Sequence, residues 1–584
     1  MRLPSKLAFR KEADAVMASE GYPNFKSDAV QKRLAAAHED LRRRYFDKSW
    51  PHVLAGKHYY SVLPENFPSF PEYVDINPYF GDSMVLGRYQ RFDPKWDVTA
   101  AIGEIDKAQD IWRETPWKVR AEYLYNLAQT LMSDEWTWRF VSALMHDTGK
   151  SGPEAYGEYN EVYRFVLAHV WYMFKRYTEK DHFKNIAAAG DYLGYSYKGR
   201  GIGLVVAPFN FPAAIPVRML TLMLAFGNVV ILKGATTASL VTRLIFDICE
   251  EVRGVTGIGP EGLVNFAPGS GGIAADAFLS DPRLKIVSFT GSSEVCRGMI
   301  EKHMYKPRVG GNQLTIGSAE TGGVNWVVLK EHQDLDWFAS QCVKGNFGIS
   351  GQKCSTTRLV FVPEKLGNEV FNRLVTAYDA LRYGNVLEGA DLGPVIDMNA
   401  KNEIDRKIAL LGESGVAQVA YRKEITPSPS GQDVAPTILI TGNRAVVDLE
   451  KMRTLLDTEI FGPVMTIVPY RSIDEVQALR PLTEYGLTGS YYDEDPKGLA
   501  DGVMFLPAGN AYGNRRSTGA TAPESFGGLG GSKSSYNSGL KGYDEVPLYV
   551  HTRTHSVLYP KGWAEKERRK FRERMERHGV AVKW

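Results

Sequence analysis

The sequence predicts an α/β fold in which a parallel sheet is covered by helices on both faces. From residue 201 onward, short apolar, β-branched runs alternate with stretches of helical pattern. The runs lie at residues 204–206, 229–232, 263–266 and 285–289. Strands buried on both faces give such continuous apolar runs, so the alternation is typical of a nucleotide-binding architecture. A second α/β pattern, from about residue 324 to residue 503, predicts a second domain.

Chain length and charge agree with this fold class. The 584 residues exceed the usual size of one domain, so two or three domains are expected. Hydrophobic residues make up 44% and charged residues 24%, as in an ordinary globular protein. Lys plus Arg (70) nearly balance Asp plus Glu (68), so neither nucleic acid nor an anionic membrane is an expected partner.

Cysteine usage and the chain start indicate a cytoplasmic protein. The four cysteines are too few and too scattered for a disulfide framework, and no Cys-x-x-Cys pair indicates zinc, so we expect no metal site. The basic first 12 residues are not followed by an apolar segment, which argues against secretion. The most apolar stretch, residues 201–232, contains Arg218 and three prolines, which favours buried strands and a helix over a membrane span.

The segments outside the two α/β patterns show less regular sequence periodicity. Residues 1–95 are predicted to form an irregular, aromatic-rich extension with one amphipathic helix at residues 28–47. Helical patterning follows at residues 97–177, interrupted near Gly149. The charged run at residues 561–577 predicts a solvated helix or a frayed tail.

Two glycine-rich strings compete as the phosphate-binding loop. GIGPEG at residues 257–262 matches G-x-G-x-x-G, but it follows a helix and precedes a strand, whereas the dinucleotide fingerprint needs the reverse order. We interpret it as an ordinary turn. PGSGG at residues 268–272 leaves a strand and opens a helix, so its N–H groups, including that of Gly271, can face a pyrophosphate.

Five strings combine a polar or reactive side chain with a strand end or a turn. They are VAPFNFP (206–212, with Asn210), the strand-end Lys233, SAETGG (318–323, with Glu320), GQKCS (351–355, with Cys354) and EIFGPV (459–464, with Glu459 and Phe461). Each string alone is a weak signal. The ordered set resembles the aldehyde dehydrogenase superfamily, and the resemblance runs from about residue 99 to residue 554. FTGS at residues 289–292 and FGG at residues 526–528 belong to the same pattern.

These residue types suit the oxidation of an aldehyde to a carboxylic acid. A hydride leaves the carbonyl carbon only after a nucleophile has formed a tetrahedral adduct, and the Cys354 thiolate is suited to that role. A free thiol has a pKa of about 8.5, so the site must lower that pKa or supply a base. The Asn210 amide and the backbone N–H of Cys354 are the candidate oxyanion donors. Glu320 is the candidate base for the water that hydrolyses the resulting thioester.

The resemblance also assigns a cofactor site for NAD or NADP. It implies that Lys233 and Glu459 hold the riboses, that Ser292 meets the pyrophosphate and that Phe461 packs near the nicotinamide. Many NAD-preferring relatives carry a Glu three residues after the strand-end Lys, where it repels a 2′-phosphate. Thr236 occupies that position here, so we expect activity with both cofactors and leave the preference open.

The expected architecture is aldehyde dehydrogenase-like, with a Rossmann-type cofactor domain, a second α/β catalytic domain and a small β oligomerisation element. The predicted boundaries are 1–95 for the N-terminal extension, 96–180 and 199–319 for the cofactor domain, 181–198 and 543–553 for the oligomerisation hairpin and strand, 320–530 for the catalytic domain and 558–584 for a charged tail. The strand at residues 543–552 would complete a partner's sheet, so a homodimer or a larger homo-oligomer is expected.

Several features lean toward the 1-pyrroline-5-carboxylate dehydrogenase branch, which oxidises glutamate semialdehyde. They are the long segment between residues 291 and 320, the Glu-x-Gly-Gly-x-Asn form of residues 320–325 and the string RSTGA at residues 516–520. That branch grips the substrate α-carboxylate with backbone N–H groups and a Ser after the Phe-Gly-Gly turn. Ser532 has a comparable place, although Lys533 stands where the branch has Gly.

The sequence leaves the aldehyde itself open. Arg358 follows Cys354 by four residues, one fewer than usual, so the substrate-binding Ser or Thr of the family is not placed. Two alternatives remain beside a hydrolytic dehydrogenase. A coenzyme-A-acylating enzyme of the same fold would not need a base such as Glu320, and a catalytically silent relative would not need Asn210, Glu320 and Cys354 together.

Overall fold

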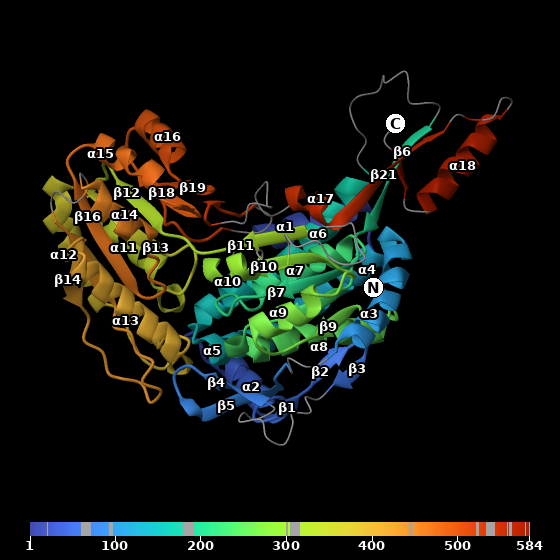
Figure 1. Cartoon of the computed structure of the whole chain (residues 1–584), viewed down its shortest axis with the longest axis horizontal. Helices are drawn as coiled ribbons and strands as arrows, with labels where there is room; N and C mark the ends of the chain where they lie inside the picture. The colour runs from blue at the N-terminus through green and yellow to red at the C-terminus, as the bar shows by residue number, and fades with distance from the viewer. Residues whose placement is uncertain are drawn as a thin grey trace.

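The computed structural model consists of two lobes and a narrow arm that projects from the larger lobe (Figure 1). It describes residues 1–19, 21–59, 72–92, 97–178, 192–299, 302–303, 316–442, 446, 448–520, 525–532, 543–557, 559, 563–577 and 580–582. Each lobe contains a seven-stranded sheet, and the arm carries a three-stranded sheet. The predicted α/β class, with two separate α/β units, is confirmed.

The sheet of the larger lobe has the strand order β11-β10-β7-β8-β9-β2-β3. Its parallel strands are β7 (Ile202–Val206), β8 (Val230–Lys233), β9 (Val264–Phe266), β10 (Leu284–Thr290) and β11 (Ile316–Glu320). The helices that follow them are α7 (Ala214–Ala225), α8 (Ser239–Thr256), α9 (Gly271–Leu279) and α10 (Ser293–Met299). Strands β7, β8 and β9 are buried along their whole length, as the continuous apolar runs predict.

The two glycine-rich strings lie between the elements that the sequence predicts. Helix α8 ends at Gly257, whose φ of 66° is in the left-handed region that favours glycine, so residues 257–262 form a turn between a helix and a strand. Residues 268–272 leave β9 and open α9, with Gly271 as the first helical residue.

Helices occupy most of residues 99–178, where the periodicity predicts a helical pattern. They are α3 (Thr99–Glu114), α4 (Trp117–Leu131), α5 (Asp134–Thr148) and α6 (Gly152–Thr178). Helix α5 ends at Thr148, and the residue that follows, Gly149, has a φ of 68°. The interruption expected near Gly149 is therefore a helix C-cap.

The helix expected at residues 28–47 is confirmed as α2, but the expectation that the rest of the N-terminal extension is irregular is wrong. In its described part, this region contains α1 (Lys6–Ala18), α2 (Asp28–Arg44), β1 (Ser49–Trp50), β2 (His52–Leu54), β3 (Lys57–Tyr59), β4 (Glu72–Asn77) and β5 (Gly81–Gln90). Strand β2 pairs with β9 through Val53 and Phe266, so the extension completes the first sheet. Strands β1, β2 and β3 have only two or three residues, too short to show a period, and β2 pairs with a strand about 200 residues away in the chain.

The smaller lobe has the strand order β14-β15-β16-β13-β12-β18-β19, parallel except for β14. The strands are β12 (Asn325–Leu329), β13 (Thr357–Pro363), β14 (Ala417–Arg422), β15 (Thr437–Thr441), β16 (Val464–Tyr470), β18 (Thr488–Tyr492) and β19 (Asn510–Gly513). The helices are α11 (Leu335–Asn346), α12 (Gly367–Asp379), α13 (Met398–Glu413), α14 (Leu449–Asp457), α15 (Ile473–Ala478) and α16 (Pro496–Phe505). Alternate residues of β12 enter two different apolar clusters, so both faces of the sheet are covered.

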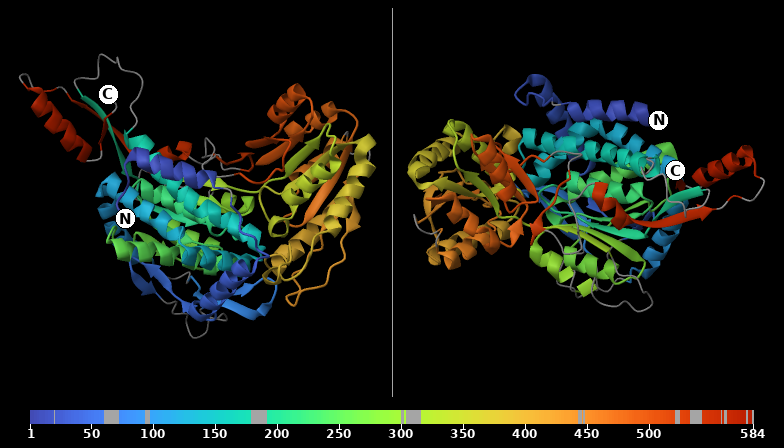
Figure 2. Two further views of the ribbon diagram at one scale, coloured as in Figure 1. Left: turned by 180° about the vertical axis from the view of Figure 1, so that it is seen from behind. Right: turned by 90° about the horizontal axis from the view of Figure 1, so that it is seen from above.

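The arm contains β6 (Tyr192–Gly199), β21 (Val550–Val557) and β22 (Val580–Val582) in the order β21-β6-β22, all antiparallel. Both views in Figure 2 show the arm and helix α18 (Glu565–Arg577) standing away from the lobes. The predicted strand at residues 543–552 begins only at Val550, because Pro547 lies in the first turn of a short helix, α17 (Val546–Tyr549). The first strand of the expected hairpin, at residues 181–191, lies outside the described residues.

Two further observations concern membrane crossing and metal binding. In the part that the structure describes, no helix is long and apolar enough to cross a membrane. Within the same residues, no cluster of His, Cys, Asp and Glu side chains is arranged to hold a metal ion.

Candidate active site

The candidate nucleophile lies in a strained loop between two elements of the smaller lobe. Cys354 follows a 3₁₀ turn at Gly348–Gly351 and precedes β13. Ile349, Ser350 and Gly351 all have positive φ values, of 47°, 51° and 74°. This conformation is unfavourable for a β-branched residue and is kept only where neighbours enforce it. The backbone N–H of Ile349 donates to Glu154 at 3.1 Å, and the Ser350 hydroxyl donates to the Gly393 carbonyl at 2.6 Å.

The surroundings of the Cys354 thiol disfavour its ionised form. Burial, followed by the carboxylates of Glu459 and Glu320, raises the pKa of this thiol to about 12. Hydrogen bonds from the backbone amides of Cys354 and Ser355 act in the opposite direction and lower that pKa. The other cysteines, Cys249, Cys296 and Cys342, are buried.

Asn210 lies beside the nucleophile loop at the carboxyl end of β7. Its side-chain nitrogen donates to the Gln352 carbonyl at 2.9 Å. An amide nitrogen carries two protons, so a second N–H is available to an oxyanion. The backbone carbonyl of Asn210 accepts from the Lys150 ammonium at 2.7 Å, and Lys150 forms a buried ion pair with Glu158. These contacts fix the Asn210 loop against helix α6.

Glu320 is the last residue of β11 and is 5% exposed. Its charge raises the pKa of the Cys354 thiol. The next residue, Thr321, donates from its backbone N–H to the Ser532 carbonyl at 2.9 Å and from its hydroxyl to the Gly531 carbonyl at 2.5 Å. The segment that carries Ser532 is therefore docked beside Glu320. The Ser532 side chain is buried, and its oxygen accepts from the Gly486 N–H at 3.0 Å.

Glu459 and Phe461 complete the part of the site that belongs to the smaller lobe. Glu459 accepts from the Gly323 N–H at 2.9 Å, and a Cβ added to Gly322 would lie 2.0 Å from the Glu459 carboxylate. Burial raises the pKa of Glu459, while Arg358 and this hydrogen bond lower it. The Phe461 ring meets the Phe209 ring edge to face, with centroids 6.1 Å apart. Strings from both lobes thus meet around Cys354.

The candidate cofactor residues lie at the carboxyl ends of the first sheet's strands. Lys233 ends β8, and burial lowers the pKa of its ammonium to about 8. The Lys233 nitrogen is 3.3 Å from the point where a Cβ on Gly271 would lie, at the N-terminus of α9. Thr236 opens the 3₁₀ turn between β8 and α8. Ser292 precedes α10, and its side chain accepts from the Val295 N–H at 3.3 Å.

Sequence reasoning missed an acidic face of α6 that lies next to the nucleophile loop. Glu154 forms an ion pair with Lys353, the residue before Cys354, at 3.1 Å. Burial and the charge of Glu158 raise the pKa of Glu161 to about 8. Glu154, Glu158 and Glu161 are spaced at i, i+4 and i+7, so they share one side of the helix. This helical spacing of acidic residues in a mostly apolar helix is visible in the sequence and could have identified the acidic face.

The comparisons with known proteins agree with this geometry. A family model described as the aldehyde dehydrogenase family matches residues 69–552. The 1-pyrroline-5-carboxylate dehydrogenase of Bacillus cytotoxicus is 29% identical over 543 residues, which cover 91% of this chain and 98% of that protein. A protein of the same name from Bacillus cereus is 29% identical over 536 residues, with 91% and 98% covered.

Solved structures give the same result. The 1-pyrroline-5-carboxylate dehydrogenase from Thermus with bound NAD has a TM-score of 0.79 at 25% identity, and the match covers 93% of this chain and 100% of that one. Proline utilization A from Bdellovibrio bacteriovorus has a TM-score of 0.82 at 24% identity, with 93% and 54% covered. The match to the family model and to these relatives defines an NAD(P)-dependent oxidoreductase that acts on aldehydes. The chain belongs to the aldehyde dehydrogenase family.

The residues at the strand ends fit a dinucleotide cofactor. A buried ammonium beside the first residue of a helix offers a positive charge and helix N–H groups to ribose hydroxyls and phosphates. Lys233 and Gly271 provide that combination. The chain therefore oxidises an aldehyde to a carboxylic acid with NAD or NADP, which confirms the predicted reaction class and cofactors.

Proposed function

We propose that this chain is a 1-pyrroline-5-carboxylate dehydrogenase, which oxidises glutamate semialdehyde to glutamate. The observation that carries the proposal is the full-length likeness to proteins of that name, which extends over 91% of this chain and 98% of the relatives. The docking of the Ser532 segment on Thr321 supports it, since this contact brings a candidate carboxylate anchor next to Glu320.

The first step of the proposed mechanism is the attack of Cys354 on the aldehyde. The thiolate forms a C–S bond to the carbonyl carbon, and the carbonyl electron pair moves onto oxygen. The side-chain N–H of Asn210 that does not donate to Gln352 stabilises this oxyanion. The backbone N–H of Cys354 is the second donor, because the sulfur is no longer a thiolate once the C–S bond has formed. Loss of one such donor typically costs about 2.7–4 kcal/mol of transition-state stabilisation.

The remaining steps oxidise and release the acyl group. The oxidised nicotinamide supplies the hydride acceptor. Collapse of the oxyanion expels the hydride from carbon and leaves a thioester on Cys354. Glu320 then removes a proton from water as the water oxygen attacks the thioester, and the Cys354 thiolate leaves with the C–S electron pair. One aldehyde, one water and one oxidised cofactor thus give one carboxylic acid, one reduced cofactor and one proton.

Ser532 is the proposed specificity residue for the substrate α-carboxylate. Its oxygen already accepts from the Gly486 N–H, so its hydroxyl proton remains to be donated to a carboxylate. A neutral aldehyde of the same length lacks the group that this donor recognises.

An aldehyde panel tests the proposal, with NAD and NADP, each with and without coenzyme A. We expect glutamate semialdehyde to have a kcat/KM at least about tenfold above that of pentanal, a difference of about 1.4 kcal/mol, with no need for coenzyme A. Ser532→Ala should reduce this preference, while Ser525→Ala, in the same segment, should retain it. A higher kcat/KM for pentanal, or a requirement for coenzyme A, would refute the proposed substrate or the hydrolytic reaction.

We also infer that the chain forms a homodimer or a larger homo-oligomer and acts in the cytoplasm. The support for assembly is the arm, which stands away from the lobes and presents an eight-residue strand, β21. Within the described residues, β21 pairs with β6 alone, so its other edge is available for a partner chain.

A further inference from the structure

Three consecutive backbone carbonyls at the candidate nucleophile accept hydrogen bonds from side chains of other elements. Asn325, the first residue of β12, donates from its side-chain nitrogen to the Cys354 carbonyl at 2.6 Å and to the Thr356 carbonyl at 2.8 Å. The Ser355 carbonyl between them accepts from the Thr488 hydroxyl at 3.3 Å and from the Ser517 hydroxyl at 3.2 Å. The backbone that carries the thiol is therefore fixed through its carbonyl groups.

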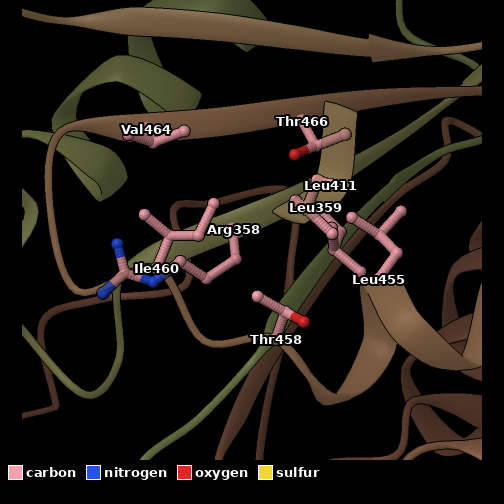
Figure 3. A pocket seen from close by; sticks show the side chains of 8 residues that line it. All are labelled: Arg358, Leu359, Leu411, Leu455, Thr458, Ile460, Val464 and Thr466. Carbon is pink, nitrogen blue, oxygen red and sulfur yellow. The ribbon is translucent and has the colours of Figure 1, made fainter. Parts of the chain in front are cut away.

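The carbonyl that precedes the nucleophile is held by Arg358. One guanidinium nitrogen donates to the Lys353 carbonyl at 3.2 Å and to the Gly351 carbonyl at 2.8 Å, and the other terminal nitrogen donates to the Gly462 carbonyl at 2.9 Å. Figure 3 shows the guanidinium directed away from Leu411 and Leu455, which line the apolar end of a small adjoining cavity.

These contacts determine where two N–H groups point. In a trans peptide the C=O and the N–H are coplanar and point in opposite directions. Fixing the Lys353 carbonyl therefore fixes the Cys354 N–H, and fixing the Cys354 carbonyl fixes the Ser355 N–H. These are the two amides whose hydrogen bonds lower the pKa of the Cys354 thiol against burial and the nearby carboxylates.

We propose that Asn325 is a positioning residue that, with Arg358, aims the amide N–H groups of Cys354 and Ser355 at the Cys354 sulfur. This inference rests on the proposed role of Cys354 as the nucleophile. Asn325 acts through the peptide group and does not contact the substrate. Its role is to favour the thiolate where two carboxylates disfavour it.

The surroundings of Asn325 fix its side chain against the nucleophile loop. Asn325 is 1% exposed, and its side-chain oxygen accepts from the Thr488 N–H at 3.0 Å, so all its hydrogen-bonding groups have matching partners. A Cβ added to Gly323 would lie 2.7 Å from the Cys354 carbonyl oxygen and 2.9 Å from the Asn325 side-chain oxygen. Glycine at this position of the Glu-x-Gly-Gly-x-Asn string therefore permits Asn325 to reach the nucleophile.

The experiment measures the alkylation rate of Cys354 by iodoacetamide as a function of pH in the full-length protein without substrate. The thiolate displaces iodide and forms a thioether, and mass spectrometry of the Cys354 peptide separates this reaction from those of the other cysteines. Below the thiol pKa, the rate follows the thiolate fraction. We expect Asn325→Ala to lower the rate about tenfold at each pH, equivalent to a rise of about one pKa unit.

Asn346→Ala is the matched control. Asn346 is also buried in the smaller lobe, and its side-chain nitrogen donates to the Thr357 carbonyl at 2.8 Å and to the Val464 carbonyl at 3.1 Å. Its loss removes two similar hydrogen bonds one residue further along the chain, without releasing the Cys354 peptide. We expect its alkylation profile to match that of the wild type.

A lower rate is informative because loosened packing would expose the sulfur and raise the rate. An unchanged or faster rate in Asn325→Ala, or an equal decrease in Asn346→Ala, would overturn the proposal. If Asn325→Ala does not fold, Asn325→Ser leaves a hydroxyl in the cavity, and the same decrease is expected. A wild type that does not oxidise glutamate semialdehyde, together with a slowed Asn325→Ala, would refute the substrate and not this inference.

Discussion

At the residue scale, Cys354 is placed among groups with opposing effects on its ionisation. Burial and two carboxylates hold the proton on sulfur, and two backbone amides favour its release. The same carboxylates have other proposed tasks, because Glu320 activates water and Glu459 holds the cofactor. A site that needs both a thiolate and a general base has to keep their charges from suppressing each other.

Replacement of the nucleophile gives the first prediction. Cys354→Ala should reduce dehydrogenase turnover to below about 1% of the wild type, because loss of a covalent nucleophile typically costs several orders of magnitude. Folding, followed by circular dichroism, and cofactor binding should be retained. Cys342→Ala, in the buried face of α11, is the control and should stay active. Turnover of Cys354→Ala comparable with that of the control would exclude Cys354 as the nucleophile.

Cofactor choice gives the second residue-scale prediction. Thr236→Glu would place a carboxylate near the ribose, where two unit charges 4 Å apart at an effective dielectric constant of 20 interact by about 4 kcal/mol. Wild type should use both cofactors, and the variant should lose at least about tenfold in kcat/KM with NADP, about 1.4 kcal/mol, and much less with NAD. Thr237→Glu is the control for a nearby charge. A wild type inactive with NADP and a variant with no change would show that Thr236 does not face the ribose.

The residues predicted from sequence are those whose chemical type is informative in a short string. A lone Cys in a Gly/Ser-rich loop, a carboxylate before two glycines and a Lys at a strand end can each be recognised without a partner. The residues that orient them could not be found in this way. Asn325 and Arg358 act on peptide groups that only the folded sheet brings within reach, and Asn325 acts across a separation of 29 residues.

At the element scale, two buried carboxyl groups lie at the N-terminus of α8, the helix that follows the Lys233 turn. Asp75 on β4 accepts from the Ser239 N–H at 2.8 Å and from the Leu240 N–H at 3.1 Å. Asp147 on α5 accepts from the Val241 N–H at 2.9 Å. Burial raises the pKa of Asp147 well above its usual value, and the neighbouring Asp75 raises it further. Burial raises the pKa of Asp75 as well, to about 6, so both carboxyl groups favour the protonated form more than a free carboxyl group does.

Asp147→Asn should be more stable than the wild type at high pH, and the difference in the free energy of unfolding should increase as the pH rises. A carboxyl whose folded-state pKa is raised stabilises the fold fully below its unfolded pKa, and this contribution is lost as pH rises toward the folded-state pKa. An amide cannot ionise, yet it still accepts from Val241 and donates to Asp75. We expect the free energy of unfolding of the variant to exceed that of wild type by at least about 1 kcal/mol at pH 8, with the difference vanishing near pH 4.

Denaturant unfolding between pH 4 and pH 8 measures this difference. Asp334→Asn, at the exposed N-cap of α11, is the control and should show no such trend. A loss of stability in Asp147→Asn that grows with pH would show that Asp147 is ionised in the folded protein.

Elements with a clear apolar pattern could be predicted from the sequence, and short strands without one could not. The strands from β7 to β10 were predictable because apolar runs buried on both faces stand out between helices. The short strands β1, β2 and β3 of the N-terminal region were not, because each has only two or three residues and depends on pairing with β5, with β9 or with each other. Pro547 was visible in the sequence, but its position inside a short helix depends on how the chain enters the arm.

At the scale of the whole molecule, the lobes contribute different parts of one site. The larger lobe supplies Asn210, Lys233 and Glu320, and the smaller lobe supplies Cys354 and Glu459. The Phe209–Phe461 contact and the Asn210–Gln352 hydrogen bond join the lobes at that point. Relative movement of the lobes would separate the nucleophile from its oxyanion donor.

The arm should determine the oligomeric state. A chain that ends at residue 549 lacks β21, α18 and β22, and we expect it to be monomeric by light scattering coupled to size exclusion. A chain that ends at residue 557 retains β21 on β6 and should keep the mass of the full-length assembly. An unchanged mass for the shorter chain would show that the subunit contact lies elsewhere.

Mass spectrometry of Cys354 in Glu320→Gln tests the central claim most directly. If Cys354 is acylated and Glu320 activates water, this variant should give a rapid, stoichiometric burst of reduced cofactor with glutamate semialdehyde, followed by slow turnover. The acyl group should then be found on the Cys354 peptide, and it should be absent from Cys354→Ala. A steady-state rate equal to that of wild type, with no adduct on Cys354, would contradict the proposed thioester mechanism and the role of Glu320 in it.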